Sequence, residues 1–217
     1  MNIFIGPMQM VNNMERRPAT EIFSEWAERG RDEGMESGHA PSVEAMLELA
    51  LPKVKPDFLA IDVGCGNGWV CRKLKKHNDC KNVVGIDGSD AMISKANSID
   101  SSGDYIHADL PEWKPSRKFD LIHSMEFLYY LTNPLNMLET FHKEWLTDGG
   151  ILVAGVDYYL ENKKSHDWPD ALNVHMTQLG IDEWKNGMIE AGFSDVEIHQ
   201  VGKKEGFIGT LVMIGRR

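Results

Sequence analysis

The chain has 217 residues, 42% of them hydrophobic and 26% charged, a composition typical of a globular protein with room for one domain and a full core. Its 23 basic and 33 acidic residues leave a net charge of −10, which disfavours a nucleic-acid partner because such partners are bound largely by lysine and arginine. Three cysteines without a CxxC pattern predict reduced thiols in a cytoplasmic protein, and they argue against a disulfide framework or a cysteine-based zinc site.

Residues 1–52 are predicted to form an N-terminal arm and two cap helices ahead of a main domain at 53–217. The start of the chain has no basic segment before a long apolar run, so we expect a loose arm and no signal peptide. No apolar run is long enough to predict a membrane span. Helical spacing of apolar residues predicts amphipathic helices at 20–30 and 42–51, which either pack against a sheet edge or cover a ligand as a lid. The polar segment between them, 28–41, is a candidate gate.

From residue 58 onward, short apolar runs alternate with helical patterns, which predicts a parallel sheet with helices on its faces. Two helix starts carry capping residues, Ser89 and the Asn133-Pro134 pair. The second of these helices is expected to end at Gly149-Gly150, and a later helix, 181–192, at Gly192. The last two strands are joined by a short turn and should pair antiparallel. The predicted strands are 58–63, 82–87, 104–109, 119–124, 151–156, 194–201 and 207–215.

The segment IDVGCGNGW, residues 61–69, places three glycines at alternate positions after the first strand. Ligands of open parallel sheets bind beyond the carboxyl ends of the strands, and glycine allows both positive φ and close approach of a ligand to the backbone. The dinucleotide fingerprint G-x-G-x-x-G would require a third glycine at position 69, where the chain has Trp69. The pattern present is D-x-G-x-G-x-G, from Asp62 to Gly68.

This pattern resembles that of the class I S-adenosylmethionine-dependent methyltransferases, and other matches follow in order. Asp87 ends the second strand and Asp109 follows the third, at positions where the family holds the ribose hydroxyls and the adenine. The resemblance covers about residues 58–215 and is greatest to the small-molecule branch that includes quinone and sterol methyltransferases. It implies a three-layer, Rossmann-like α/β sandwich with a seven-stranded, mostly parallel sheet and an antiparallel closing strand.

The resemblance also implies a cofactor, S-adenosyl-L-methionine, and its product, S-adenosyl-L-homocysteine. The methionine end is expected at the glycine segment, the ribose at the end of the second strand and the adenine after the third. The sulfur of Cys65 is interpreted as a packing feature and not as a nucleophile. The residues expected to bind the cofactor are Asp62, Gly64, Cys65, Gly66, Gly68, Asp87, Gly88, Met92, Asp109, Leu110 and Met125.

The methyl acceptor is expected to be a small or lipophilic metabolite attacked at O, N, C or S, with a base needed only where the acceptor is not already nucleophilic. Candidate catalytic residues are Glu126, Tyr130 and His166; His39 and His175 are further candidate bases. No His/Cys/carboxylate set has convincing ligand spacing, so no metal is predicted. The long segment 160–177 is a candidate active-site loop. The expected acceptor pocket contains Trp26, His39, Tyr129, Tyr158 and Tyr159, although some of these tyrosines can equally be core residues.

Two alternatives to methyl transfer remain open from the sequence. One is a non-catalytic module that binds S-adenosylmethionine or stabilises a partner. The other is an NAD-dependent oxidoreductase, against which Trp69 and the closing strand pair count. Methylation of a nucleic-acid base is disfavoured by the net charge and by the sequence SMEF after the fourth strand, where base-amino methyltransferases usually carry an Asn- or Asp-Pro-Pro-Tyr segment.

Overall fold

The computed structural model describes residues 16–217, so most of the predicted N-terminal arm lies outside the described residues. Seven strands form one sheet in the order β3-β2-β1-β4-β5-β7-β6. β7 pairs antiparallel with both β5 and β6, and the other pairs are parallel, which confirms the predicted Rossmann-like class. The strands are β1 (Phe58–Val63), β2 (Cys80–Asp87), β3 (Asp104–His107), β4 (Phe119–Met125), β5 (Leu146–Val156), β6 (Ser194–Val201) and β7 (Thr210–Arg216).

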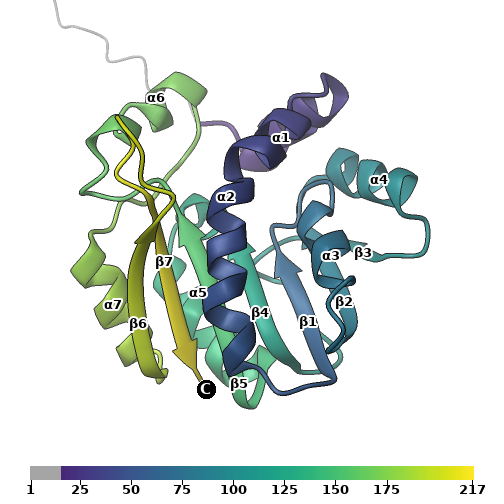
Figure 1. Cartoon of the computed structure of the whole chain (residues 1–217). Coiled ribbons are helices and arrows are strands. Elements are labelled where there is room, and N and C mark those ends of the chain that lie inside the picture. The colour runs from purple at the N-terminus through teal and green to yellow at the C-terminus, as the bar shows by residue number, and fades with distance from the viewer. Residues whose placement is uncertain (1–15) are drawn as a thin grey trace, which may run out of the picture.

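Helices cover both faces of the sheet, because alternate strand residues point to opposite faces. Ala60 of β1 packs with one helix layer, whereas its neighbour Ile61 packs with the other. The first layer holds α2 (Asp32–Ala50), α3 (Trp69–Leu74) and part of α4 (Asp90–Ile99); the second holds α5 (Pro134–Thr140) and α7 (Ile181–Glu190). Figure 1 shows α2 in front of the sheet, with α1 (Ala19–Glu28) and α6 (Trp168–Leu172) at the end toward which β1 points. Among residues 16–217, none of the helices has the length and apolarity of a membrane span.

The two predicted helix caps are confirmed. Ser89 Oγ accepts a hydrogen bond from the Met92 amide at 3.2 Å, and Asn133 Oδ1 accepts one from Asn136 at 3.2 Å. The helix that follows Asn133 is shorter than predicted, because it ends at Thr140, passes through a π-helical turn (141–145) and gives way to β5 at residue 146. The expected stop at Gly149-Gly150 is therefore wrong, since both glycines lie inside β5.

The candidate gate at 28–41 is largely helical. α2 begins at Asp32 and continues through Pro41, so the predicted helix 42–51 is only its second half. That half is part of the sheet core, where Val43 and Met46 are fully buried. The first half extends past the sheet toward α1, at the carboxyl ends of the parallel strands (Figure 1).

Candidate active site

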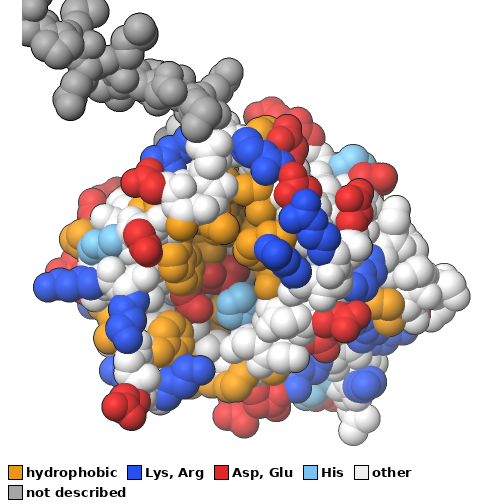
Figure 2. Space-filling model, turned by 90° about the horizontal axis from the view of Figure 1, so that it is seen from above, with side chains coloured by type: hydrophobic (Ala, Val, Ile, Leu, Met, Phe, Trp, Pro, Cys, Tyr) orange, Lys and Arg blue, Asp and Glu red, His pale blue; other side chains and the backbone are white. Residues whose placement is uncertain are grey.

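A cavity of about 340 Å³ lies at the carboxyl ends of β1, β2 and β4, between these strand ends and the first halves of α1 and α2. Its size is within the range of small-molecule sites. Figure 2, seen from above, shows the hollow with hydrophobic side chains around it and acidic and histidine side chains at its floor. The cavity therefore combines an apolar wall with a few polar groups, as expected of a site that orients a ligand.

The three glycines after β1 all have positive φ, +76° at Gly64, +53° at Gly66 and +78° at Gly68, a conformation that side chains disfavour. Their surroundings differ. A Cβ atom at Gly64 would lie 2.8 Å from Cβ of Phe127, and one at Gly68 would lie 2.4 Å from Cε1 of Tyr105. At Gly66 the nearest such atom is 3.9 Å away. Only Gly66 leaves open space, so Gly64 and Gly68 are glycines for turn geometry and protein packing; Gly68 is also absent from the described cavity wall.

Asp87, at the end of β2, faces the glycine turn. Its Oδ2 accepts the amide of Gly66 at 2.9 Å, and its Oδ1 accepts the amide of Ser89 at 2.8 Å. Burial raises the pKa of Asp87 above its ordinary value, although these two amides act to lower it. Each carboxylate oxygen accepts more than one hydrogen bond, so each retains a lone pair for a ligand hydroxyl.

A buried pair, Asp62 and His123, lies at the floor of the cavity. Nδ1 of His123 is 2.7 Å from Oδ1 of Asp62, and both side chains are almost completely buried. Nε2 of His123 has no hydrogen-bond partner among residues 16–217, and His123 is part of the cavity wall. Because a buried polar atom without a partner costs stability, this nitrogen is a candidate contact for a polar ligand group. This contact was not predictable from the sequence, since His123 lies inside β4.

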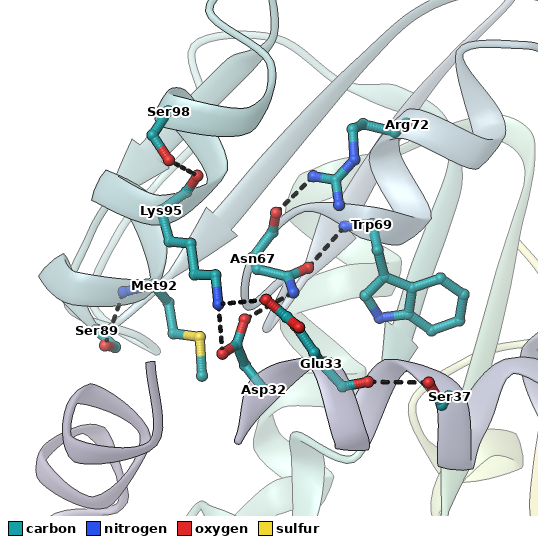
Figure 3. Close-up of polar contacts among 10 residues, drawn as sticks. All are labelled: Asp32, Glu33, Ser37, Asn67, Trp69, Arg72, Ser89, Met92, Lys95 and Ser98. Carbon is teal, nitrogen blue, oxygen red and sulfur yellow. Dashed lines mark hydrogen bonds and ion pairs between the residues drawn. The ribbon is translucent and has the colours of Figure 1, made fainter. Parts of the chain in front are cut away.

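A polar network joins the start of α2 to the glycine turn and to α4 (Figure 3). Asp32 accepts hydrogen bonds from Asn67 at 2.9 Å and from Lys95 at 2.7 Å. The carbonyl of Asn67 accepts one from Arg72 at 2.6 Å, and its side-chain oxygen accepts one from the Trp69 amide at 3.2 Å. Burial acts to raise the pKa of Asp32, but the bonds from Lys95 and Asn67 outweigh it, and the pKa is lowered. The network fixes α2 over the turn.

A second titratable cluster lies on the other side of the cavity, where His39 of α2, Glu126 after β4 and Asp157 after β5 bring one ligand atom each within 4.8 Å of one another. Glu126 has a φ of +58°, and its carboxylate accepts hydrogen bonds from the Tyr129 hydroxyl at 2.7 Å and the Asp157 amide at 2.5 Å. Nε2 of His39 is 3.9 Å from Oδ2 of Asp157. Oδ1 of Asp157 is buried and has no partner among the described residues.

Burial shifts all three members of this cluster toward their neutral forms. The pKa of Glu126 is raised well above its ordinary value by burial and by the charge of Asp157. Burial also raises the pKa of Asp157 and lowers the pKa of His39. Groups with shifted pKa values in a cavity are candidates for proton transfer. Sequence spacing could not reveal the cluster, because its members come from three separate segments that only the fold brings together.

The structure brings most of the sequence-predicted site residues to the cavity wall. In this group are the residues expected at the methionine end, the ribose and the adenine, together with three from the expected catalytic and acceptor sets. They are Asp62, Gly64, Cys65, Gly66, Asp87, Gly88, Met92, Asp109, Leu110, Met125, Glu126, Tyr130 and His39.

Three predicted pocket tyrosines lie behind the wall instead. Tyr129 is buried and supports Glu126 through its hydroxyl. Tyr159 is buried and donates its hydroxyl hydrogen to the carbonyl of Gly209 at 2.8 Å. Tyr158 is 5% exposed and belongs to the core on the α5 and α7 face of the sheet. These positions correct the prediction that the three tyrosines are part of the acceptor pocket and favour the alternative that they are core residues.

The predicted catalytic residue His166 is also outside the cavity. It is exposed after β5, and its Nε2 lies 2.9 Å from the carbonyl oxygen of Leu160. His175 is exposed as well and lies beside Thr177. Trp26, on α1, packs edge to face against Phe23 but is not part of the wall. The segment 160–177 is not one long loop, because it contains a 3₁₀ turn and α6.

Several residues of the cavity wall were missed as site residues. Asn67 and Trp69 lie inside the glycine segment and Phe127 follows Glu126, so these three could have been inferred from their neighbours; the others carry no local signal. The missed residues are Pro18, Ala19, Thr20, Phe23, Asp32, Glu36, Asn67, Trp69, Val70, His123, Phe127 and Leu131; Met35 also lines the wall, as expected of the candidate gate.

Comparison with known proteins links this geometry to one family. A family model described as "Methyltransferase domain" matches residues 38–198. Among curated proteins, trans-aconitate 2-methyltransferase of Escherichia coli O157:H7 (strain EC4115 / EHEC) is 30% identical over 121 residues, which cover 56% of this chain and 47% of that protein. The chain therefore spans about half the length of the curated relatives it matches.

Among solved structures, one chain of the complex between the Haloferax volcanii Trm112 methyltransferase activator and the putative methyltransferase superposes with a TM-score of 0.80. It is 26% identical, and the match covers 89% of this chain and 96% of that one. N-methyltransferase NodS from Bradyrhizobium japonicum WM9, solved with S-adenosyl-L-homocysteine, gives a TM-score of 0.61 at 21% identity and covers 80% and 84% of the two chains. At this identity the second likeness shows the fold alone.

Proposed function

The chain belongs to the methyltransferase-domain family, whose model matches residues 38–198, and from this premise we propose that it transfers a methyl group from S-adenosylmethionine to a small-molecule acceptor. The observation that carries the proposal is the pairing of Asp87 with Gly66 at the cavity wall. One oxygen of Asp87 fixes the open glycine, and both oxygens keep lone pairs for a ligand. A carboxylate in this position suits two adjacent hydroxyls, such as those of a ribose.

The polar groups along the cavity fit the parts of this cofactor in order. Asp109 and Leu110 would hold the adenine, and Asp87 the ribose. The amino-acid end would meet the open backbone at Gly66 and the unpartnered Nε2 of His123. When bound, S-adenosylmethionine supplies an electrophilic methyl group on a positively charged sulfur.

The protein's own contribution is mainly to hold the two reactants in line and to keep water away. Ideal positioning is worth roughly 7–11 kcal/mol of a reaction barrier. Phe23 and Met35, from α1 and α2, cover the strand ends and supply an apolar wall. Cys65 does not act as a nucleophile in this account, because burial raises the pKa of its thiol well above the ordinary value and keeps it neutral.

A small molecule is favoured as the acceptor because the cavity encloses about 340 Å³ between α1, α2 and the strand ends. The net charge of −10 remains the argument against a nucleic acid. We also propose a cytoplasmic location, which is supported by the free thiols of Cys65, Cys71 and Cys80. The oxidoreductase alternative finds no support, since Trp69 begins α3 where a dinucleotide site requires glycine.

The proposal is tested by incubating the purified chain with S-adenosylmethionine carrying a tritiated methyl group and a fractionated extract of its host. We expect label in a low-molecular-mass fraction and an equal amount of S-adenosylhomocysteine. Cofactor binding without label in any fraction would instead favour the non-catalytic binding module. Label in the nucleic-acid fraction would contradict the small-molecule acceptor.

A further inference from the structure

The cavity wall is strongly acidic. Six of the wall residues at 16–217 have carboxyl side chains, and none of the wall residues in this range is lysine or arginine. The sequence of residues 1–15 contains no lysine or arginine either. Asp32 is ion-paired with Lys95 at 2.7 Å, but this lysine is engaged outside the wall. An anionic acceptor would enter this cavity against repulsion that no lysine or arginine of the described wall offsets. The carboxyl groups belong to Asp32, Glu36, Asp62, Asp87, Asp109 and Glu126.

One buried carboxylate beside the cavity has an oxygen without a hydrogen-bond donor among the described residues. Asp157 is 6% exposed, and its Oδ1 has no partner among the described residues, while its Oδ2 lies 3.9 Å from Nε2 of His39. Its neighbour Glu126 already accepts two hydrogen bonds but keeps further lone pairs. An unsatisfied buried acceptor gains from any ligand that brings a donor, and an ammonium group brings three.

Aromatic rings stand on the same part of the wall. Phe23 and Tyr130 pack edge to face with ring centroids 5.3 Å apart, and both line the cavity. Aromatic faces attract cations at short range. Leu131 and Phe127 complete an apolar surface for the organic part of a ligand. Carboxylates and aromatic rings, with no lysine or arginine among the wall residues at 16–217, form a surface suited to an organic cation.

We propose that the methyl acceptor is an amine, which enters as an ammonium ion, binds at the His39–Glu126–Asp157 cluster and is methylated on nitrogen. This inference rests on the methyl transfer proposed above and names its substrate class. The ammonium nitrogen first gives a proton to the carboxylate of Asp157, and the nitrogen regains its lone pair. That lone pair forms the new N–C bond as the C–S bond breaks, and the electrons of the broken bond stay on sulfur. The products are the methylated ammonium ion, the neutral thioether S-adenosylhomocysteine and a protonated Asp157, which then releases its proton to water.

This acceptor differs in charge from the one in the name of the curated relative, trans-aconitate, which is a carboxylate-rich anion. Because the alignment covers 47% of that protein, its substrate does not transfer to this chain. The acidic wall and the cluster at Asp157 argue for the opposite charge. Charge is therefore the property that an experiment should vary.

The test measures calorimetric binding of two ligands of similar shape and opposite charge, phenethylamine and 3-phenylpropionate, to the full chain saturated with S-adenosylhomocysteine. Trans-aconitate is the third ligand. We expect phenethylamine to bind roughly tenfold or more tightly than either acid, as one charge-assisted hydrogen bond would give. Asp157→Asn should weaken phenethylamine binding by about the same factor and leave the affinity for S-adenosylhomocysteine unchanged. Asp148→Asn, at a side chain 96% exposed, is the control for the same change of charge.

Equal or tighter binding of the acids, or no binding of phenethylamine, would overturn the inference, and this result does not depend on how the Asp157 variant folds. If S-adenosylhomocysteine binds in that case, the methyl-transfer proposal stands and only the substrate class is wrong. If S-adenosylhomocysteine itself does not bind, the proposed function fails first. Displacement of phenethylamine by Mg²⁺ or Zn²⁺ would assign the cluster to a metal ion and overturn the amine site.

Discussion

The replacement Asp87→Asn removes one charge from the cavity and leaves the size of the side chain almost unchanged. In the native chain, the two carboxylate oxygens of Asp87 accept the amides of Gly66 and Ser89 at 2.9 and 2.8 Å. Asparagine has one accepting oxygen and one donating NH₂ group. One of the two backbone amides therefore loses its acceptor. If the carboxylate also binds two cofactor hydroxyls, as proposed, one of them loses its acceptor as well.

Each loss has an expected size. A hydrogen bond to a charged group contributes about 1.5–3 kcal/mol, so losing one should raise the Kd for S-adenosylhomocysteine by about 10- to 150-fold. The backbone amide left without a partner should cost about 1–3 kcal/mol of folding stability. For a chain of this length, each kcal/mol lowers the Tm by roughly 2–4 °C. Weaker binding should thus accompany a modest loss of stability.

Calorimetry gives the Kd, and a thermal melt gives the Tm of the same preparation. Asp90→Asn is the matched control. It makes the same change of charge three residues away, at a side chain that is 78% exposed. The reasoning is refuted if Asp87→Asn binds S-adenosylhomocysteine within twofold of the native chain. It is also refuted if Asp90→Asn weakens binding to the same extent.

The remaining predictions concern packing and pH. Gly68→Ala should lower the free energy of unfolding by about 2–5 kcal/mol, which a thermal melt would show as a lower Tm. The reason is that Gly68 has a φ of +78° and the new Cβ would lie 2.4 Å from a ring carbon of Tyr105. An unchanged Tm would contradict this, because it would mean that the turn relaxes without cost. With an amine acceptor, kcat/KM should fall on acidification at a pH above the ordinary carboxyl range, because burial raises the pKa of Asp157 and its protonated form cannot take the amine proton. The titratable groups that face Asp157 are Glu126, whose pKa is also raised, and His39, whose pKa is lowered. If the Asp157→Asn variant has the same pH profile, the fall in kcat/KM at acidic pH belongs to another group.

Features set by local chemistry were predictable from the sequence. The caps at Ser89 and Asn133 depend on a side-chain oxygen and an amide three residues later, so the sequence contains both partners. Strand β1 matches its predicted range because its apolar run is bounded by polar residues and glycine. The antiparallel closing pair followed from the short connection between β6 and β7.

The length of α2 was not predictable in this way. Gly34, Gly38 and Pro41 are all weak helix formers, and together they indicate a break. The helix nevertheless begins at Asp32, where distant partners, Asn67 and Lys95, hold its first turn. A Cβ at Gly34 or Gly38 would meet nothing within 4 Å, so neither glycine is required by packing. Tertiary contacts therefore stabilise the first half of α2 although its residues have a low helix propensity.

The residues of the candidate site also differ in how far local sequence predicts them. Residues of the glycine segment and Asp87 could be found because they lie next to one another in a pattern. His123 could not, because a histidine in the middle of an apolar strand has no local feature that separates a core position from a ligand contact. For Tyr159 the local pattern was misleading. Tyr159 follows a strand end, as site residues often do, but its hydroxyl donates a hydrogen bond to the carbonyl of Gly209 inside the core. Only the three-dimensional fold shows that His123 lies at the cavity and Tyr159 in the core.

The central claim is that the cavity at the ends of β1 and β2 binds S-adenosylmethionine, and calorimetry with three ligands tests it most directly. The native chain should bind S-adenosylmethionine and S-adenosylhomocysteine with one molecule per chain, and it should not bind NAD. Tight binding of NAD without binding of either methionine-derived ligand would contradict the account.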